Sequence, residues 1–211
     1  MRNSILKRPF LFLCTLGTLF LSCLSCIYAD IYKDGLVMVQ HEKIDVIREG
    51  QHIQFRHPCK LSEQTIAGIL SSITYKEKGF FKRVGTLRVF HDDEIKALSP
   101  LIARALSVAT PTQAISFSSY YYRLILSDRR NYGVLFITDH SLNIVFSHIH
   151  KFQTMNDFMS DKKGYFTTRE NPLHKRHSSF WELIPSPRQH LEPGHENWLV
   201  VDLPDETETK Q

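Results

Sequence analysis

Hydrophobic and polar residues alternate on both sides of a polar turn near residue 50. Ile44 and Val46 precede Glu49-Gly50-Gln51, and Ile53 and Phe55 follow it. A period of two residues is typical of a strand with one buried face, and a glycine between two such segments favours a tight turn. This pattern predicts an N-terminal β-hairpin.

The next regular pattern has the spacing of an α-helix. Isoleucine and leucine recur every three or four residues from Ile66 to Ile73, and Ser62 is placed to cap the first turn. We therefore predict a helix from Ser62 to about Tyr75, followed by a strand over residues 86–90.

Three acidic residues, Asp92-Asp93-Glu94, open a second predicted helix whose apolar stripe continues to Ala109. Carboxylates at a helix start cap free N–H groups and complement the helix dipole, so this position explains them without acid/base catalysis. Pro100 lies within the stripe, and we expect a kink there or a restart capped by Ser99.

A run of apolar and alternating segments follows and predicts an antiparallel meander. The segments are residues 113–119, 121–127, 133–139 and 142–149. Polar turns are expected at 128–131 and 139–141. No clear turn separates the first two segments, which leaves open one long bent strand in their place.

The last third contains a long polar segment, residues 151–177, with one short helix suggested at 156–159. Segments of this length are usually functional or mobile. Two late strands, 179–184 and 198–203, enclose a turn-rich stretch at 185–194.

Taken together, the predicted helices and strands indicate an α+β fold: a largely antiparallel sheet, made of a meander plus an N-terminal hairpin, with two helices packed on one face. That fold class selects no function.

The first 29 residues have the layout of a secretory leader. Three basic residues lie between Met1 and Arg8, and no charged residue occurs from Pro9 to Ala29. We therefore predict export. Ordinary cleavage after Ala29 would release the mature chain, whereas an uncleaved run of this length would span a bilayer as a helix.

Two consecutive tripeptides in the leader, Leu21-Ser22-Cys23 and Leu24-Ser25-Cys26, resemble the lipobox of bacterial lipoproteins. The resemblance covers only the leader. It implies acylation of Cys23 or Cys26 and tethering to a membrane leaflet. Lipid attachment, simple cleavage and an uncleaved anchor stay open, and they place the protein in the periplasm or on a membrane.

Charge and cysteine content narrow the possible partners and the domain organisation. The chain has a net charge of +4, but the leader holds three basic and no acidic residues, so 23 basic and 22 acidic residues remain and the net charge from Asp30 onward is +1. This balance gives no broad positive field, and no nucleic-acid partner is expected.

Cleavage after Ala29 would leave Cys59 as the only cysteine, so the fold has to rest on its core rather than on disulfides. We expect one globular domain over residues 30–204 and a disordered acidic tail at 205–211.

Histidine is the most suggestive candidate for chemistry, because six of the eleven lie in the last third of the chain. His148 and His150 are two apart on a predicted strand and would share one face, while His174 and His177 are three apart, within reach of one helical turn. Pairs of this kind occur in zinc and copper sites, so these four residues are candidate metal ligands.

A structural interpretation of these histidines is favoured over the metal site. Leu142, Ile144 and Phe146 share the predicted strand face of His148, which directs that imidazole towards the core. The chain has neither HExxH nor two paired CxxC motifs.

Cys59 is a second candidate for chemistry. It lies two residues after His57 and just before the helix that Ser62 caps, and a helix N-terminus with a nearby cation lowers a thiol pKa. A reactive thiol is one interpretation. Burial as a small apolar side chain is the other, and it is the common outcome for an unpaired cysteine.

Two hypotheses of function follow. The first is a non-enzymatic module, tethered to the membrane, that binds another envelope protein through a sheet edge or through residues 151–177. The second is a periplasmic metal-binding protein or metal-dependent hydrolase that uses the four C-terminal histidines with zinc or copper. The chain carries no recognisable catalytic motif, which favours the first hypothesis and predicts a non-enzyme without a resident cofactor.

Overall fold

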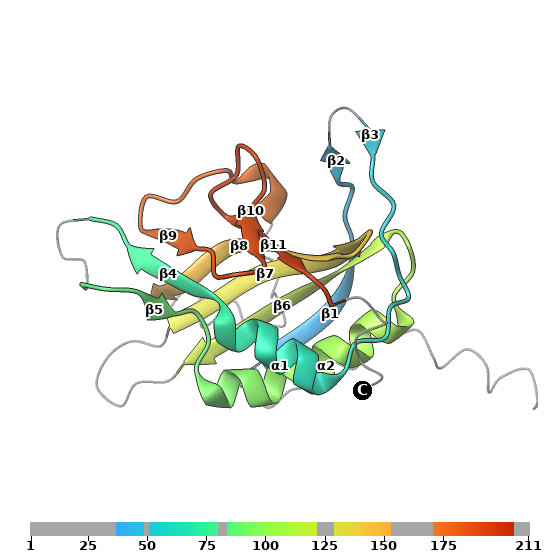
Figure 1. Cartoon of the computed structure of the whole chain (residues 1–211), viewed down its shortest axis with the longest axis horizontal. Coiled ribbons are helices and arrows are strands. Elements are labelled where there is room, and N and C mark those ends of the chain that lie inside the picture. Colours follow the sequence, from blue (N-terminus) through green and yellow to red (C-terminus); the bar gives the residue numbers. More distant parts are fainter. Residues whose placement is uncertain (1–36, 49–50, 80–83, 122–128, 153–170, 205–211) are drawn as a thin grey trace, which may run out of the picture.

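The computed structural model describes residues 37–48, 51–79, 84–121, 129–152 and 171–204. Their largest element is a six-stranded antiparallel sheet with the strand order β1-β6-β7-β8-β11-β10 (Figure 1). In that order the strands are β1 (Val37–Lys43), β6 (Gln113–Tyr121), β7 (Arg129–Thr138), β8 (Ser141–Phe152), β11 (Trp198–Asp202) and β10 (Gln189–Leu191). The predicted α+β class, with a largely antiparallel sheet and two helices, is confirmed.

Two small sheets accompany the large one. A three-stranded sheet has the order β5-β4-β9, and a two-stranded sheet pairs β2 with β3. The strands are β5 (Leu87–Arg88), β4 (Thr74–Glu77), β9 (Trp181–Ile184), β2 (Ile47–Arg48) and β3 (Gln51–His52). The β2–β3 hairpin and the β4–β5 hairpin project from opposite ends of the domain (Figure 1).

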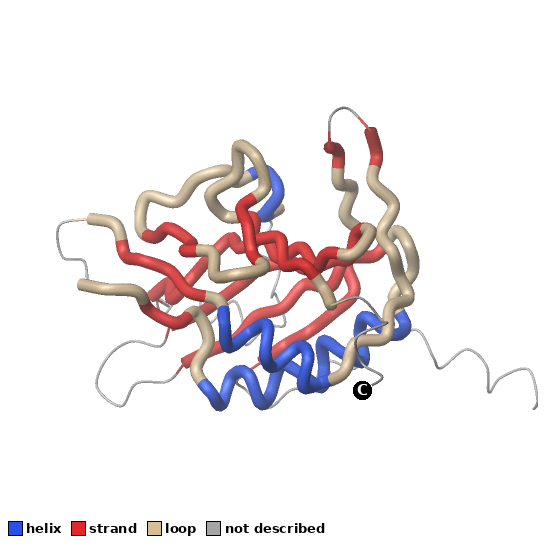
Figure 2. Tube along the Cα trace, in the orientation of Figure 1, coloured by secondary structure: helices blue, strands red, loops and turns tan. Residues whose placement is uncertain are grey.

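Both helices cover one face of the large sheet (Figure 2). They are α1 (Glu63–Ser72) and α2 (Asp92–Val108), and a short 3-10 helix, η1 (Pro172–His174), lies near the C-terminus. Ser62 is the N-cap of α1, because its Oγ accepts a hydrogen bond from the N–H of Thr65 at 3.0 Å. The prediction that this helix reaches Tyr75 is wrong: Thr74–Glu77 form β4, which pairs with both β5 and β9.

Helix α2 is continuous through Pro100, so of the two predicted alternatives the restart at Ser99 is wrong, while the kink stays a prediction. The hydroxyl of Ser99 donates to the carbonyl of Ile95 at 2.7 Å instead of capping a new helix. Proline removes one backbone donor, and the apolar face of α2 keeps the helix on the sheet despite that loss. The described structure therefore has one long helix here.

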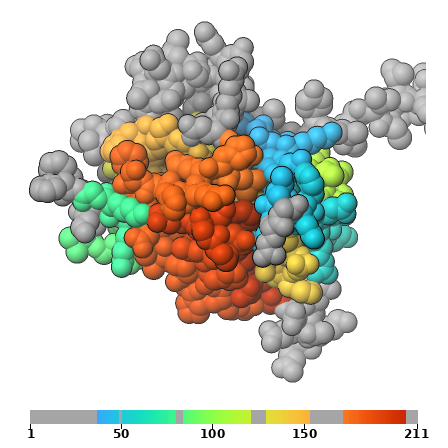
Figure 3. All heavy atoms as spheres, turned by 90° about the horizontal axis from the view of Figure 1, so that it is seen from above, coloured from blue at the N-terminus to red at the C-terminus, as the bar shows by residue number. Residues whose placement is uncertain are grey.

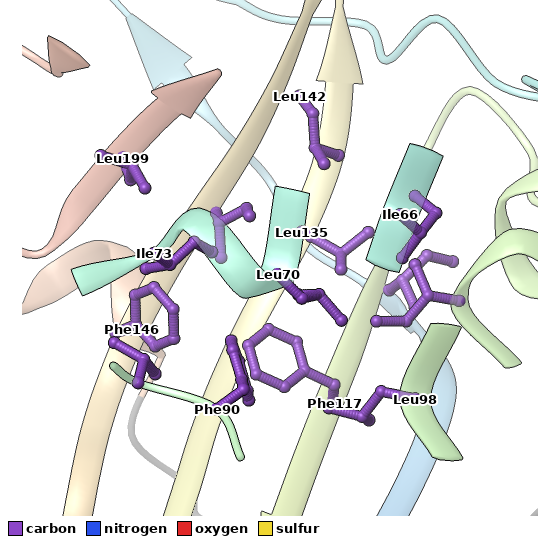
Figure 4. Close-up of a cluster of buried hydrophobic side chains, with 14 of the residues drawn as sticks. Ile66, Leu70, Ile73, Phe90, Leu98, Phe117, Leu135, Leu142, Phe146 and Leu199 are labelled. Carbon is purple, nitrogen blue, oxygen red and sulfur yellow. The ribbon is translucent and has the colours of Figure 1, made fainter. Parts of the chain in front are cut away.

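The main core lies between the helices and the sheet (Figure 4). At its centre are Phe90, Phe117 and Phe146, whose ring centroids are 5.9 to 6.1 Å apart. Ile66 and Leu70 of α1 pack into the same cluster and are almost fully buried. The 3.6-residue spacing predicted from the sequence thus corresponds to the buried face of α1.

A second apolar cluster covers part of the opposite face. It consists of Val46, Phe55, Ala114, Val134, Phe136, Val145, Trp198 and Val200. Phe55 stacks on Phe136 with the ring centroids 4.7 Å apart, so the base of the β2–β3 hairpin closes this cluster. Figure 3 shows the C-terminal residues, in orange and red, between the β2–β3 hairpin in cyan and the β4–β5 hairpin in green.

Three predicted boundaries in the second half of the chain are wrong. β7 begins at Arg129, so most of the expected turn at 128–131 is strand, with Asn131 opposite Ser119. β8 continues to Phe152, and β10 forms inside the stretch that was predicted to be turns. The three residues of β10 are too few to show a period, whereas the ends of β7 and β8 depend on pairing between the two strands.

Candidate functional site

Several predicted features lie outside the described residues. These are Cys23 and Cys26, the short helix at 156–159 and the tail at 205–211. In the part of the chain that the structure does describe, none of the helices combines the length and the apolar character needed to cross a bilayer.

Two β-bulges in β8 change the predicted orientation of His148. Tyr132 is opposite His148, whereas the residue after Tyr132 is opposite Phe146, and a second register shift lies on the other side of Tyr132. Each extra residue reverses the alternation of faces. His148 packs against Tyr132 with ring centroids 6.5 Å apart, on the sheet face that also carries Val134 of the second cluster. The prediction that His148 shares the core-facing side of Phe146 is wrong.

His150 lies on the helix side of the sheet, so the two strand histidines do not share a face. Its Nε2 is 2.8 Å from the carbonyl oxygen of Val89, and its Nδ1 is 2.8 Å from the hydroxyl of Tyr75. A neutral imidazole with the proton on Nε2 satisfies both contacts, since the tyrosine hydroxyl then donates to Nδ1. Both ring nitrogens of His150 are therefore used inside the protein.

His174 and His177 are both exposed, and no helical turn joins them, because η1 ends at His174. The Nδ1 of His177 lies 3.5 Å from Glu196 Oε1, while Glu196 Oε2 accepts a hydrogen bond from Lys78 at 2.8 Å. Among the residues described, no three histidine, cysteine or carboxylate side chains come together in a way that could hold a metal ion.

Cys59 lies beside the main core and is half-buried. Its backbone N–H donates to the carbonyl of Leu106 at 3.0 Å. The neighbouring His57 is buried and bridges two strands: Nδ1 donates to the carbonyl of Gln113 at 2.8 Å, and Nε2 accepts from the N–H of Ile137 at 3.1 Å. This bonding requires a neutral imidazole. His57 therefore does not supply the cation that would activate the Cys59 thiol.

Burial lowers the pKa of His57 below its ordinary value of 6.5, with a smaller contribution in the same direction from His41. Below about pH 6.5 the unfolded chain therefore binds a proton at this imidazole that the folded chain does not bind. The free energy of unfolding consequently falls as the pH drops below that value. We expect His57→Gln to reduce this loss, measured as the free energy of unfolding between about pH 7 and pH 5. His190→Gln, which removes an exposed imidazole, is the control, and an unchanged pH dependence in His57→Gln would contradict the assignment.

A buried polar cluster that the sequence did not reveal lies at the start of α2. We call it the Glu94 network and define it by Glu94, Ser119, Asn131 and His150. Glu94 Oε2 accepts from the backbone N–H of His91 at 2.8 Å. Glu94 Oε1 accepts from the hydroxyl of Ser119 and from Asn131 Nδ2, the latter at 3.0 Å. Asn131 Oδ1 accepts from the N–H of His150 at 2.9 Å.

The chemistry of the Glu94 network is structural. A serine nucleophile needs a base that removes its proton and an open side where a substrate can approach. Here the Ser119 hydroxyl points at a carboxylate that two further donors already hold, and Glu94 is only 3% exposed. The network joins the N-terminus of α2 to β6, β7 and β8.

The comparisons with known proteins do not assign the chain to a family. No protein-family model, curated protein or solved structure matches this chain. A role therefore has to be argued from the surfaces of the domain.

The β2–β3 hairpin presents an exposed apolar side chain at one end of the domain. It projects from the domain, and Ile47 at its start is 61% exposed (Figure 1). Its position is fixed from the side, because the Arg48 guanidinium forms an ion pair with Glu192 and lies 5.5 Å from the ring centre of Trp198. A firmly held, exposed apolar side chain loses little conformational entropy when it binds.

Proposed function

We propose that this chain is an exported, membrane-tethered envelope protein that acts as a non-enzymatic binding module. Its β2–β3 hairpin would present Ile47 to another envelope protein. The observation that carries the proposal is the fixed, exposed position of this hairpin, clamped by Arg48 and Glu192. The leader pattern supports export, and the resemblance of Cys23 and Cys26 to lipobox cysteines supports the tether.

Buried polar side chains form hydrogen bonds within the domain, which favours a binding function over catalysis. His57 and His150 engage both ring nitrogens within the domain, and the Glu94 carboxylate accepts three internal hydrogen bonds. Groups that are already satisfied and buried are poorly placed to exchange protons with a substrate. The near-neutral charge after residue 30 is consistent with a protein partner.

Site-specific photo-crosslinking tests this function. A photoreactive amino acid at position 47 of the full-length chain, expressed in the organism that encodes it, is expected to give one discrete protein adduct. The matched control is position 108, since Val108 is similarly exposed, at 64%, and lies at the end of α2 rather than on the hairpin. An adduct from both positions, or from neither, would contradict the proposal. Arg48→Ala should weaken the adduct, because it removes the clamp.

A further inference from the structure

The described chain begins at one defined end of the large sheet. β1 is antiparallel to β6, and Val37 is opposite Ser119, two residues before β6 ends. β7 begins and β8 ends at the same place, because Arg129 is opposite both Tyr121 and Phe152. The connection from the leader therefore enters the domain here, and we call this region the leader-proximal end.

The β4–β5 hairpin and the start of β9 also reach the leader-proximal end. Arg129 Nη1 lies 3.9 Å from Glu77 Oε1 at the end of β4. The N–H of Lys78 donates to the carbonyl of Phe180 at 2.8 Å, just before β9 begins. One end each of β1, β4, β6, β7, β8 and β9 therefore lies in this region.

Exposed apolar side chains gather at this end. Val84 is 98% exposed, Phe180 77% and Phe152 53%. Among the described residues the other exposed large hydrophobic side chains are Ile47, which follows β1, and Val108, which ends α2 before β6 begins, so both lie at the opposite end of the sheet. Solvent-facing aromatic side chains concentrated in one region mark a contact surface.

Basic side chains accompany the aromatic ones. Lys76 and Lys151 are exposed, and the Arg129 guanidinium lies 4.5 Å from the ring centre of Phe152. On β4, β9 and the adjoining strand ends the charged residues outside the core are Lys76, Lys78, Arg129 and Lys151 against Glu77 and Glu182, and Lys76 is opposite Glu182. Glu196 pairs with Lys78. Aromatic rings beside lysine and arginine are characteristic of residues at a membrane interface.

We propose that the leader-proximal end docks on the lipid bilayer that holds the leader. Phe152 and Phe180 insert among the headgroups, and the lysines face acidic phospholipids. The inference rests on the tethering in the proposed function. Val37 follows Cys26 by eleven positions, a reach of at most roughly 40 Å and about the diameter of a domain of this size. A tether of that reach allows this end to contact the membrane.

Quenching by brominated lipids tests the docking. The full-length chain is reconstituted in vesicles of phosphatidylethanolamine and phosphatidylglycerol, with tryptophan introduced at one exposed position at a time. Phe152→Trp and Phe180→Trp report on the leader-proximal end, and Ile47→Trp and Val108→Trp are the matched controls. The signal of the buried Trp181 and Trp198 is subtracted with the unsubstituted chain. Quenching is expected to be roughly twofold or more greater at positions 152 and 180, because interfacial side chains insert about 5–10 Å.

Equal quenching at all four positions, no quenching, or greater quenching at the controls would overturn the docking. The intact mass of the same preparation tests the tether separately. A chain that starts at an acylated Cys23 or Cys26, or that keeps its leader, supports the tether, whereas a chain that starts at Asp30 overturns it. The intact mass and the quenching can therefore refute the tether and the docking independently. Preferential quenching without a tether would still support the lipid-binding surface.

Discussion

Replacing Glu94 with alanine is expected to lower the free energy of unfolding by about 3 kcal/mol or more. The side chain is 3% exposed, and its two oxygens accept hydrogen bonds from the backbone of His91 and from the side chains of Ser119 and Asn131. Alanine removes the acceptor of the His91 N–H and of the Ser119 hydroxyl. It leaves Asn131 Nδ2 with only its longer contacts, to the Val89 carbonyl at 3.2 Å and to the Ser119 hydroxyl at 3.3 Å. Each donor that loses its acceptor in the interior costs roughly 1–3 kcal/mol. Urea unfolding, followed by the fluorescence of Trp181 and Trp198, measures the change.

Asp93→Ala is the matched control, because this carboxylate stands next to Glu94 in the same helical turn but is exposed. Its loss should cost less than about 1 kcal/mol, the usual size of a surface interaction with the helix dipole. Similar losses in the two variants would mean that Glu94 acts only as a helix-start charge. Glu94→Gln should fall between them, since its amide keeps one acceptor oxygen.

The helices could be predicted from the sequence because their signals are local. The cap of α1 depends on Ser62 and Thr65, three residues apart, and the buried face of α1 follows from apolar spacing alone. The start of α2 was recognised from its acidic residues. The partners of Glu94 were not, because Ser119 and Asn131 lie 25 and 37 residues further along the chain.

The orientation of the strand histidines could not be predicted for a different reason. Alternation along β8 is reliable up to Phe146, which belongs to the main core. Beyond that point two bulges depend on the register with β7, and register is a property of two strands together. A single strand pattern therefore placed His148 on the wrong face and paired it with His150 as if both shared a site.

The two ends of the domain differ in a way that fits the proposed function. One end carries the exposed Phe152 and Phe180 and the start of β1, and the other carries the β2–β3 hairpin. A module that docks at the first end would hold Ile47 away from the bilayer. Between the ends, the side chains of Glu94 and His57 join α2 and the chain before α1 to the central strands by hydrogen bonds.

Gly133→Ala should lower the free energy of unfolding by about 3 kcal/mol, because overpacked core positions usually cost 1–3 kcal/mol and sometimes more. A Cβ atom at this position would lie 2.6 Å from the backbone oxygen of Val145 and 2.9 Å from Cζ of Phe117. The phenylalanine ring can move, but the carbonyl belongs to the β7–β8 ladder beside a bulge and cannot. Adding Phe117→Leu should therefore recover only part of the loss.

Gly68→Ala makes the same chemical change in α1, where nothing lies within 4 Å of the new Cβ. That control should raise stability by about 0.5–1 kcal/mol through helix propensity, so the two identical substitutions are expected to differ in sign in the same urea titration. Equal effects would show that the close approach of the β7 and β8 backbones is not what requires glycine at position 133.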